Sequence, residues 1–413
     1  MTQEQSRFAG PVAYVTGQYP SVSHTFIQRE VVGLRALGVQ VVTCTVRRPP
    51  AKSVVGPEQQ AEAAQTFAIL ATARNPMTLL AAHGRMLRRA PGRWFAALRL
   101  AWATRPPGLK AFLWQMAYFL EAGVLADHVL GQGVQHMHNH FGDSSGSLTM
   151  IASEMSGIPF SITLHGPTIF FEMHWWRLDA KVARAAFIAC ISHFCRSQAM
   201  LFSDQAHWPK LRIVHCGVTP ARYGPTRQGT APRPVFSGHV CFVGRLDAVK
   251  GVPLLLEAFA ANHPRHPQAR LTIAGDGPAR AALEAQVRLL GLTGSVRFTG
   301  YLDEAAVAAL LQEADMLVLP SFAEGLPVVL MEALASHIPV IATQVAGVSE
   351  LVQDGVSGFI VPPGDVETLA LRLDRLLSDP ELCAAMGQAG RAKVEAEFDI
   401  RTEVDKLAAL FKV

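Results

Sequence analysis

The sequence predicts an α/β protein of two domains, each built on a parallel sheet flanked by helices. The chain has 413 residues, too many for one comfortable hydrophobic core and enough for two α/β domains. In its second half, short β-branched runs alternate with longer amphipathic runs. Strict β-α alternation is typical of a doubly wound sheet, whose ligands bind at the carboxyl ends of its strands.

The composition restricts the class of protein. Half of the residues are apolar and 17% are charged, which is typical of a well-buried globular chain. The formal net charge of +4 is too weak to indicate a nucleic-acid partner, and we expect none. The six cysteines are scattered without a C-x-x-C pair, which favours a reduced, cytoplasmic protein. The first eleven residues lack an apolar core and no long apolar run follows, so we expect neither a secretory signal nor a spanning helix.

The first domain is expected over residues 1–220. Strands are expected at VAYVT (from Val12) and VQVVTCTV (from Val39), with a helix from His24 to Leu37 between them. A mostly helical insertion follows over about 58–131. The α/β pattern then resumes with VQHMHNH, FSITLH and AFIACIS.

The second domain is expected over 239–385, after a linker at 221–238 that is rich in Pro, Gly and Arg. Five buried apolar runs predict its strands: HVCFVG, RLTIAG, SVRFTG, DMLVLPS and IPVIAT. The runs between them predict helices. A last helical segment, 386–413, is expected to pack back towards the first domain.

Two cations follow the first strand of the second domain, in VGRLDAVKG. Gly244 ends the strand, and Arg245 and Lys250 lie in the loop that opens the next helix. Cations near a helix N-terminus suit a diphosphate. The alternative is a solvated basic turn.

Two glutamates, Glu324 and Glu332, lie eight residues apart in SFAEGLPVVLMEALA. Pro327 suits the first turn of a helix, which places Glu324 in the loop above the strand. The N–H groups of Gly325, Leu326 and Val328 would then point at an anionic ligand, and a carboxylate accepts well from vicinal hydroxyls. Two surface glutamates are the alternative for such a pair on its own.

A third strand-loop-helix unit, TQVAGVSELVQDGVSGFIVPPGD, places Gly347 where a close backbone approach is expected. Glu350 lies at the start of its helix. A favourable interaction with the helix dipole is enough to explain that carboxylate.

Taken together, these motifs resemble the donor-binding half of the family-4 GT-B glycosyltransferases, over about 235–370. The resemblance implies two Rossmann-like domains whose parallel sheets face a central cleft, and a nucleoside-diphosphate sugar donor. It assigns the diphosphate to Arg245 and Lys250, following Gly244. It assigns the donor sugar to Glu324 and to the N–H groups of Gly325, Leu326 and Val328, with Pro327 in the same turn. It assigns the ribose to Glu332. The base would lie near Gly300 and Tyr301.

The first half resembles the exopolysaccharide subgroup, colanic-acid-type transferases included, in YPSVSHTFIQREVVGLRALG, HMHNHF, SITLHG and IVHCGV. Two departures stand out there. His24 replaces the glutamate of the usual S-E-T-F-I, and Thr168 replaces the aspartate of H-G-x-D-I. We therefore expect acceptor chemistry that differs from that of relatives. In the second half, AGVSE replaces G-G-x-P-E, a departure that affects the loop at Ala346 and not the fold.

Four histidines are candidate functional residues. His136, His138 and His140 alternate along one strand and share a face, so they could ligate a metal. No Cys, Asp or Glu before Asp143 completes such a site, so we expect no metal. His165 ends FSITLH, and the resemblance places it against the transferring sugar or the acceptor. A structural role for His165 is the alternative.

The functional hypothesis is a retaining hexosyltransferase, with His165, Glu324, Arg245 and Lys250 as its catalytic set. It would use a UDP-sugar, or second a GDP-sugar, and a lipid-linked saccharide acceptor, with no cofactor. Front-face attack is favoured over a covalent intermediate on Glu324. The alternatives are a nucleotide-sugar epimerase, a phosphorylase, or a catalytically silent assembly scaffold.

An anionic membrane surface is a further expected partner, at the cytoplasmic face. Residues 71–120 contain no Asp or Glu. They contain eight cations interleaved with aromatics: Arg74, Arg85, Arg88, Arg89, Arg93, Arg99, Arg105 and Lys110, with Trp94, Phe95, Trp102, Phe112, Trp114 and Phe119. This pattern suits a helix lying on a bilayer. The alternative is a core of aromatics beneath solvated arginines.

Overall fold

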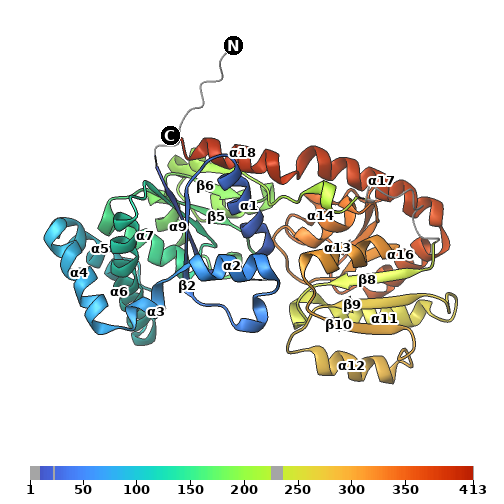
Figure 1. The fold of residues 1–413 in the computed structure, drawn as a ribbon. Helices are drawn as coiled ribbons and strands as arrows, with labels where there is room; N and C mark the ends of the chain where they lie inside the picture. Colours follow the sequence, from blue (N-terminus) through green and yellow to red (C-terminus); the bar gives the residue numbers. More distant parts are fainter. Residues whose placement is uncertain (1–9, 22–23, 225–235, 413) are drawn as a thin grey trace, which may run out of the picture. The chain divides into compact units, whose positions relative to one another are not determined.

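The computed structural model describes residues 10–21, 24–224 and 236–412, which form two compact units (Figure 1). The first contains residues up to 215 and those from 404 onward, and the second contains 216–403. Of the predicted linker, 225–235 lie outside the described residues, as does Ser23 of the SHTFI motif.

The first unit contains a seven-stranded parallel sheet in the order β3-β2-β1-β4-β5-β6-β7. Its strands are β1 (Val12–Gln18), β2 (Val41–Arg47), β3 (Phe67–Ala68), β4 (His136–His140), β5 (Phe160–Leu164), β6 (Ile188–Cys190) and β7 (Leu211–Ile213). Its helices are α1 (Thr25–Ala36), α2 (Pro57–Gln65), α3 (Ile69–Ala73), α4 (Pro76–Arg89), α5 (Pro91–Ala103), α6 (Leu109–Gly131), α7 (Ser144–Ser156), α8 (Thr168–Phe171), α9 (Leu178–Arg184) and α10 (His193–Leu201).

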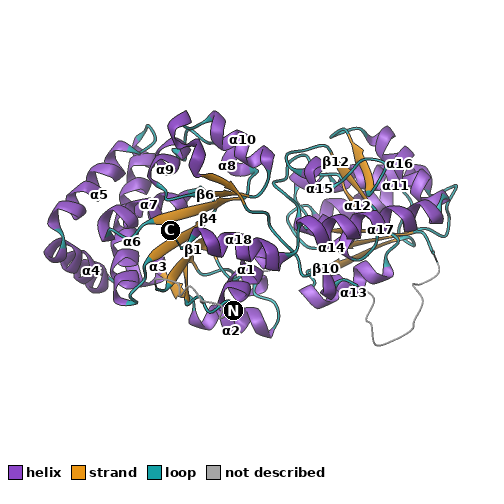
Figure 2. Ribbon diagram, turned by 90° about the horizontal axis from the view of Figure 1, so that it is seen from above, coloured by secondary structure: helices purple, strands orange, loops and turns teal. Residues whose placement is uncertain are grey.

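The second unit contains a six-stranded parallel sheet in the order β10-β9-β8-β11-β12-β13. Its strands are β8 (His239–Val243), β9 (Arg270–Ala274), β10 (Val296–Gly300), β11 (Met316–Leu319), β12 (Val340–Thr343) and β13 (Gly358–Val361). Its helices are α11 (Val252–Asn262), α12 (Arg280–Leu289), α13 (Glu304–Glu313), α14 (Val328–Ala335), α15 (Val348–Leu351), α16 (Val366–Ser378) and α17 (Pro380–Glu397); α18 (Ile400–Leu410) ends on the first unit (Figure 2).

Both sheets have the strand order of the doubly wound fold, which confirms the predicted fold class. In each, the order reverses beside the first strand, between β1 and β4 and between β8 and β11. Ligands of such sheets bind outside the carboxyl ends of the strands at this switch point. The loops that follow these strands are therefore where each unit presents its polar groups.

The helices begin where side chains cap them. Asp143 accepts from the Ser145 N–H at the start of α7, and Ser192 accepts from the Cys195 N–H at the start of α10. Asp303 and Asp365 cap α13 and α16 in the same way. Each cap satisfies an amide that the first helical turn leaves without a partner.

Three short strands were not predicted. They are β3, β7 and β13, of two to four residues, each at or next to an edge of its sheet. Runs this short carry too little periodicity to distinguish a strand from a loop. The insertion predicted at 58–131 is helical apart from β3, which pairs with Cys44 and Thr45 of β2.

One carboxyl group in this insertion is destabilising at neutral pH. Burial raises the pKa of Glu121 on α6 to about 7, although the positive charge of Arg47 opposes the shift. Its Oε2 lies buried without a hydrogen-bond partner among the described residues. The folded state therefore prefers the neutral acid. The free energy of unfolding falls as the pH rises from about 4.3, the pKa of glutamate in an unfolded chain, through about 7, the pKa of Glu121 in the fold.

We predict that Glu121→Gln raises the free energy of unfolding by about 2 kcal/mol at pH 8 and leaves it almost unchanged at pH 4. Thermal unfolding of both proteins across this range measures the difference. Glu313→Gln, at an exposed position on α13, is the matched control and should show no such pH dependence. A constant Glu121→Gln effect at all pH values would contradict the prediction.

Candidate active site

Three loops of the second unit meet at the carboxyl edge of its sheet. They follow β8, β11 and β12, which are neighbours in the sheet. The Phe322 N–H donates to the Val249 oxygen at 2.8 Å, and the Gly347 N–H donates to the Gly325 oxygen at 3.1 Å. The Thr343 hydroxyl donates to the Ser321 oxygen. These bonds join the loops that carry Lys250, Glu324 and Gly347.

Glycines allow this close approach. Gly251 has φ +63°, and a Cβ there would lie 2.1 Å from the Pro320 oxygen of the β11 loop. A Cβ on Gly275 would lie 1.9 Å from the Gly244 oxygen. Neither position can accept a side chain without moving backbone, so these residues fix the spacing of the site.

Lys250 and Glu324 form a partly buried ion pair within this edge. The Lys250 Nζ donates to Glu324 Oε1 at 2.7 Å, and the Ser321 hydroxyl donates to the same oxygen at 2.6 Å. Glu324 is 7% exposed. Arg245 is different, because its side chain is 62% exposed and pairs with Asp247 at 3.0 Å. One predicted cation is thus held in place, whereas the other extends into solvent.

Glu332 lies in the second turn of α14, as predicted, and is also buried. The Tyr223 hydroxyl donates to Glu332 Oε1 at 3.0 Å. Tyr223 and Ser321 are partners that the sequence analysis missed. Ser321 was within the quoted motif, but Tyr223 lies in the expected linker and carried no signal.

The turn before α14 gathers the remaining predicted donor residues. Pro327 is the N-cap of α14 and Val328 its first residue. Leu326 is buried, and Gly325 accepts the bond from Gly347 described above. The positive end of the α14 dipole therefore lies beside the Lys250–Glu324 pair, a favourable place for an anion.

Gly300 and Tyr301 follow β10, at the edge of the same sheet. The Gly275 N–H donates to the Gly300 oxygen at 2.8 Å, and Gly300 has φ +76°. Tyr301 is 37% exposed. Because β9 separates β10 from β8, these two residues border the site and do not touch the ion pair.

A pocket in the second unit lies elsewhere, along α12. It is lined by His239, Arg270, Arg288 and Arg297, among others. None of the predicted donor-binding residues lines it. The candidate site therefore rests on the three loops and not on this pocket.

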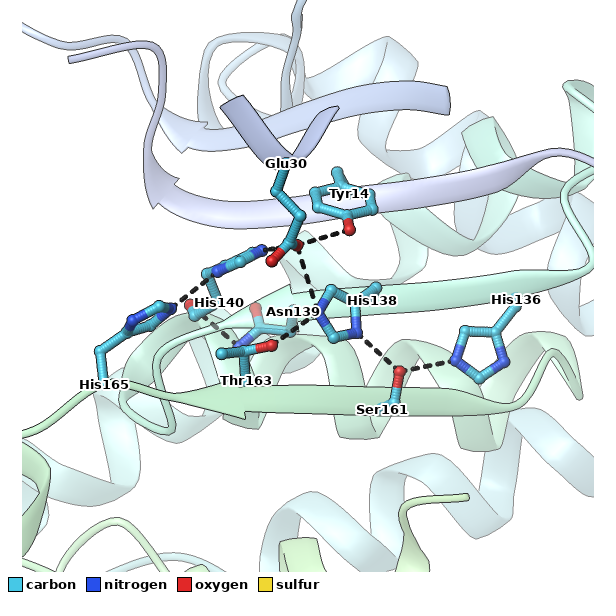
Figure 3. Close-up of polar contacts among 9 residues, drawn as sticks. All are labelled: Tyr14, Glu30, His136, His138, Asn139, His140, Ser161, Thr163 and His165. Atoms are coloured by element: carbon cyan, nitrogen blue, oxygen red, sulfur yellow. Dashed lines mark hydrogen bonds and ion pairs between the residues drawn. The ribbon is translucent and has the colours of Figure 1, made fainter. Parts of the chain in front are cut away.

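The first unit holds a buried polar network at the carboxyl ends of β4 and β5 (Figure 3). Glu30 of α1 accepts from the Tyr14 hydroxyl at 2.6 Å, and its Oε1 lies 3.1 Å from Nε2 of His140. His140 Nδ1 lies 2.8 Å from Nε2 of His165. Thus His165 is linked to α1 through one imidazole.

The other two histidines of β4 bond to hydroxyls of β5. His138 lies between the hydroxyls of Ser161 (2.7 Å) and Thr163 (2.8 Å), and His136 Nε2 is 2.7 Å from Ser161. Burial lowers the pKa of His136 to about 4 and the pKa of His138 well below its usual range. Both rings are therefore neutral at physiological pH.

The prediction that no carboxylate meets these histidines was wrong. Glu30, His138 and His140 place three ligand atoms within 4.8 Å of one another, a set that could hold a metal ion. Glu30 was overlooked because it is distant in sequence, although it lies within the quoted QREVVGL segment. Each of these atoms also has a hydrogen-bonding partner within the network.

His24 replaces the glutamate of the S-E-T-F-I motif and occupies the N-cap position of α1. Its side chain makes no hydrogen bond to the first turn of that helix. Its Nδ1 lies 3.1 Å from the Gln18 oxygen, so Nδ1 must carry the proton. Burial lowers the pKa of His24, although that bond opposes the shift. A neutral donor therefore stands where relatives present a carboxylate.

Comparisons with known proteins relate this chain to glycosyltransferases. The family Glycosyl transferases group 1 matches residues 237–393. An alpha-D-kanosaminyltransferase from Streptomyces kanamyceticus is 29% identical over 67% of this chain and 76% of its own length. A putative colanic acid biosynthesis glycosyltransferase, WcaL, from Escherichia coli is 31% identical over 49% of this chain and 51% of its own. The chain thus spans about half the length of the second relative.

The fold is shared with the crystal structure of Anabaena Alr3699/HepE in complex with UDP-glucose. The TM-score is 0.71 with 18% identity, covering 96% of this chain and 98% of that one. The chain thus has the GT-B fold. Within it, the residues that match the Glycosyl transferases group 1 family, 237–393, make up most of the second unit.

The departure at Ala346 falls on a strained backbone position. Ala346 has φ +46°, in the left-handed region that a Cβ disfavours. The AGVSE loop therefore holds Ala346 in a conformation that lowers the stability of the fold.

We predict that Ala346→Gly raises the free energy of unfolding by about 1 kcal/mol and that the β-branched Ala346→Val lowers it by about as much. Chemical denaturation of the three proteins measures both changes. As a control, Ala285→Gly in the middle of α12 should destabilise, because glycine weakens a helix interior. If Ala346→Gly destabilised the protein as much as the control does, the positive φ of Ala346 would not be a source of strain.

Proposed function

We propose that the protein is a retaining glycosyltransferase that moves a hexosyl group from a nucleoside-diphosphate sugar to a lipid-linked saccharide in exopolysaccharide synthesis. The observation that carries the proposal is the partly buried Lys250–Glu324 pair beside the N-terminus of α14. A cation, a carboxylate and a helix dipole suit a donor that combines a diphosphate with sugar hydroxyls. UDP-sugars are favoured, since a protein of this fold binds UDP-glucose, and GDP-sugars come second.

In this proposal, Lys250 and the exposed Arg245 stabilise the charge that develops on the leaving diphosphate. Preorganised cations and amides of this kind are the expected main source of catalysis. Glu332 would accept from the ribose hydroxyls, and Tyr223 holds its carboxylate in place. His165 would contact the transferring sugar or the acceptor.

The bonds to Glu324 favour front-face attack over a covalent intermediate. One of its oxygens already accepts from an ammonium and a hydroxyl, and such donors stabilise a carboxylate and weaken it as a nucleophile. Glu324 is then better suited to accept from sugar hydroxyls. The leaving phosphate would assist deprotonation of the acceptor.

We predict that Lys250→Ala lowers turnover about a hundredfold, because a charge-assisted contact to developing charge contributes about 3 kcal/mol. Nucleotide release from UDP- and GDP-sugars, with and without saccharide acceptor, measures it. Lys393→Ala, which removes a surface ion pair with Glu397 on α17, is the matched control.

Glu332→Ala should instead weaken binding of the free nucleoside diphosphate, and calorimetry measures this change.

Normal turnover by Lys250→Ala would contradict the diphosphate assignment. The same assay separates the alternatives. A phosphorylase needs free phosphate, an epimerase converts its substrate without an acceptor, and a silent scaffold releases no nucleotide.

A membrane-facing surface on α4, α5 and α6 is part of the proposal. Large apolar side chains are exposed there: Met77, Leu80, Leu87, Phe95, Trp102, Leu109, Leu113, Trp114 and Leu120. At 100° per residue, Met77, Leu80, Leu87 and Arg88 fall on one stripe of α4. Exposed apolar side chains gathered on neighbouring helices mark interaction sites.

Among the described residues, none of the helices has the length and apolar character to cross a bilayer.

The structure divides the aromatic and basic residues of this segment into two groups. Trp94 and Phe119 pack inside, where Trp94 donates to His83 at 3.0 Å, whereas Phe95, Trp102 and Trp114 are exposed. Arg85 forms a bidentate pair with Asp127. The exposed Arg88 and Arg89 are better placed to meet anionic headgroups, so they are the residues to test.

We predict that the protein sediments with anionic liposomes and not with neutral ones, and that salt reverses this by screening surface charge. Arg88→Glu with Arg89→Glu should abolish sedimentation while donor hydrolysis continues. Arg288→Glu with Leu289→Ser, on exposed α12, is the control. Equal binding to both liposome types, or to neither, would refute the membrane surface.

A further inference from the structure

The acidic side chain of Glu121, on α6 of the first unit, lacks a partner for one of its oxygens. Glu121 is 8% exposed, and its Oε2 lies buried without a hydrogen-bond partner among the described residues. A buried polar atom of this kind lowers stability and needs an explanation. Contact with a ligand is such an explanation, because residues that serve function often lower the stability of the fold.

Glu121 belongs to a cluster at the edge of the sheet where doubly wound proteins bind ligands. Arg47, the last residue of β2, is close enough for its charge to lower the pKa of Glu121 against the effect of burial. Burial raises the pKa of Tyr118, and the negative charges of Glu121 and Asp143 raise it further. Asp143 is the N-cap of α7 and follows β4. Because β2 and β4 both pair with β1, the cluster lies at the carboxyl edge of the sheet.

Trp114 completes this cluster. The Arg47 guanidinium lies 6.0 Å from the centre of the Trp114 ring, and the rings of Trp114 and Tyr118 are 6.4 Å apart. Trp114, Tyr118 and Glu121 follow one another at spacings of four and three residues, so they form one stripe on α6. Trp114 is 47% exposed. The cluster therefore combines an accessible aromatic face with a guanidinium and a carboxyl group.

The mixed charges of the cluster indicate a neutral, hydroxylated ligand. An anion would be repelled by Glu121 and Asp143, and a cation would be repelled by Arg47. A hydroxyl group both donates and accepts, so neighbouring hydroxyls can donate to a carboxylate and accept from a guanidinium. A ligand hydroxyl would also supply the bond that Glu121 lacks. An aromatic face with a few polar groups around it is typical of sites that fix the orientation of a small ligand.

We propose that Arg47, Trp114 and Glu121 form a binding subsite for a neutral saccharide, which holds one sugar ring of the acceptor. The C–H face of the ring packs on Trp114. One hydroxyl donates to Glu121, and another accepts from Arg47. The role of this saccharide as the acceptor rests on the proposed function, whereas saccharide binding rests on the cluster alone.

The subsite is separate from the exposed leucines of the membrane-facing surface. At 100° per residue, Leu109, Leu113 and Leu120 lie within about 40° of one another on α6. The stripe that contains Trp114 is centred about 120° further round the helix. The leucines can therefore contact a bilayer while Trp114 packs against a sugar ring.

The test uses the whole protein on an array of immobilised neutral and acidic oligosaccharides, with and without UDP. At pH 8, above the pKa of about 7 of Glu121, we expect the wild type to bind at least one neutral oligosaccharide. Glu121→Gln should weaken that binding about tenfold, because a hydrogen bond to a charged group is stronger than one to an amide. Trp114→Ala should weaken it about as much, because the sugar ring loses its apolar contact.

Two matched controls separate binding from a general effect of substitution. Trp175→Ala removes a tryptophan of similar exposure, 45%, from the first unit, and Glu313→Gln removes an exposed carboxylate from the second. Both should bind the oligosaccharide as the wild type does. Thermal unfolding gives a further check, since Glu121→Gln should bind less saccharide although it is more stable. A damaged fold cannot produce that combination.

Three outcomes would overturn the proposal. The first is a wild type that binds none of the neutral oligosaccharides, and the second is wild-type affinity in either Glu121→Gln or Trp114→Ala. The third is a Trp114→Ala variant that loses sedimentation with anionic liposomes but keeps its saccharide, which would assign Trp114 to the membrane-facing surface.

The same proteins distinguish this proposal from the proposed function. If the wild type binds the saccharide and both variants bind it less well, but no nucleotide sugar is turned over, the proposed function fails while the subsite stands. If nucleotide sugar is turned over and the KM for the acceptor is the same in the wild type and both variants, the subsite fails while the function stands.

Discussion

The central strands of both sheets, unlike the edge strands β7 and β10, are mostly buried, and this constraint determines where polar chemistry can lie. A parallel sheet covered on both faces needs near-continuous apolar strands, as β8, β11 and β12 are. These three strands therefore contain no Asp, Glu, Lys or Arg, and the charged groups at this edge lie in the loops and helix starts that follow them. Lys250, Glu324 and Glu332 all follow from this rule, since each lies in or just after a loop at the carboxyl edge.

The strand β4 is the exception. It carries three imidazoles and an amide into the buried layer, where each polar group costs free energy unless it is hydrogen-bonded. The register of β4 with β5 supplies the partners, because His138 is opposite Ser161 and His140 is opposite Thr163. Glu30 and Tyr14 complete the network from α1 and β1. A buried network of this kind persists only when nearly every member is satisfied, which is why its proton positions are so constrained.

These two sites show what the sequence could predict and what it could not. The second domain was predicted in detail because its strands are apolar runs with clear boundaries and its site lies within contiguous motifs. The sequence did not predict hydrogen-bond partners from distant elements, such as Tyr223 for Glu332 and Glu30 for His140. Contacts of that kind depend on which strands are neighbours, and no local pattern encodes this. Ala346 was recognised as a departure in sequence, but only the backbone angle explains its cost.

In the donor site proposed above, Lys250 and Glu324 satisfy each other's charge and are also the groups offered to the substrate. Lys250 and Glu324 are 22% and 9% exposed at their side chains, so neither charge is well hydrated, and each satisfies the other. A diphosphate would compete for the Lys250 ammonium, and a sugar hydroxyl could then donate to Glu324 in its place. The exchange preserves the number of charge-assisted bonds while moving them to the substrate. Ser321 donates to Glu324 independently of Lys250, so the carboxylate would remain oriented during the exchange. A site built in this way leaves neither charge unpaired, and in the proposed function it passes their charge-assisted bonds to the donor.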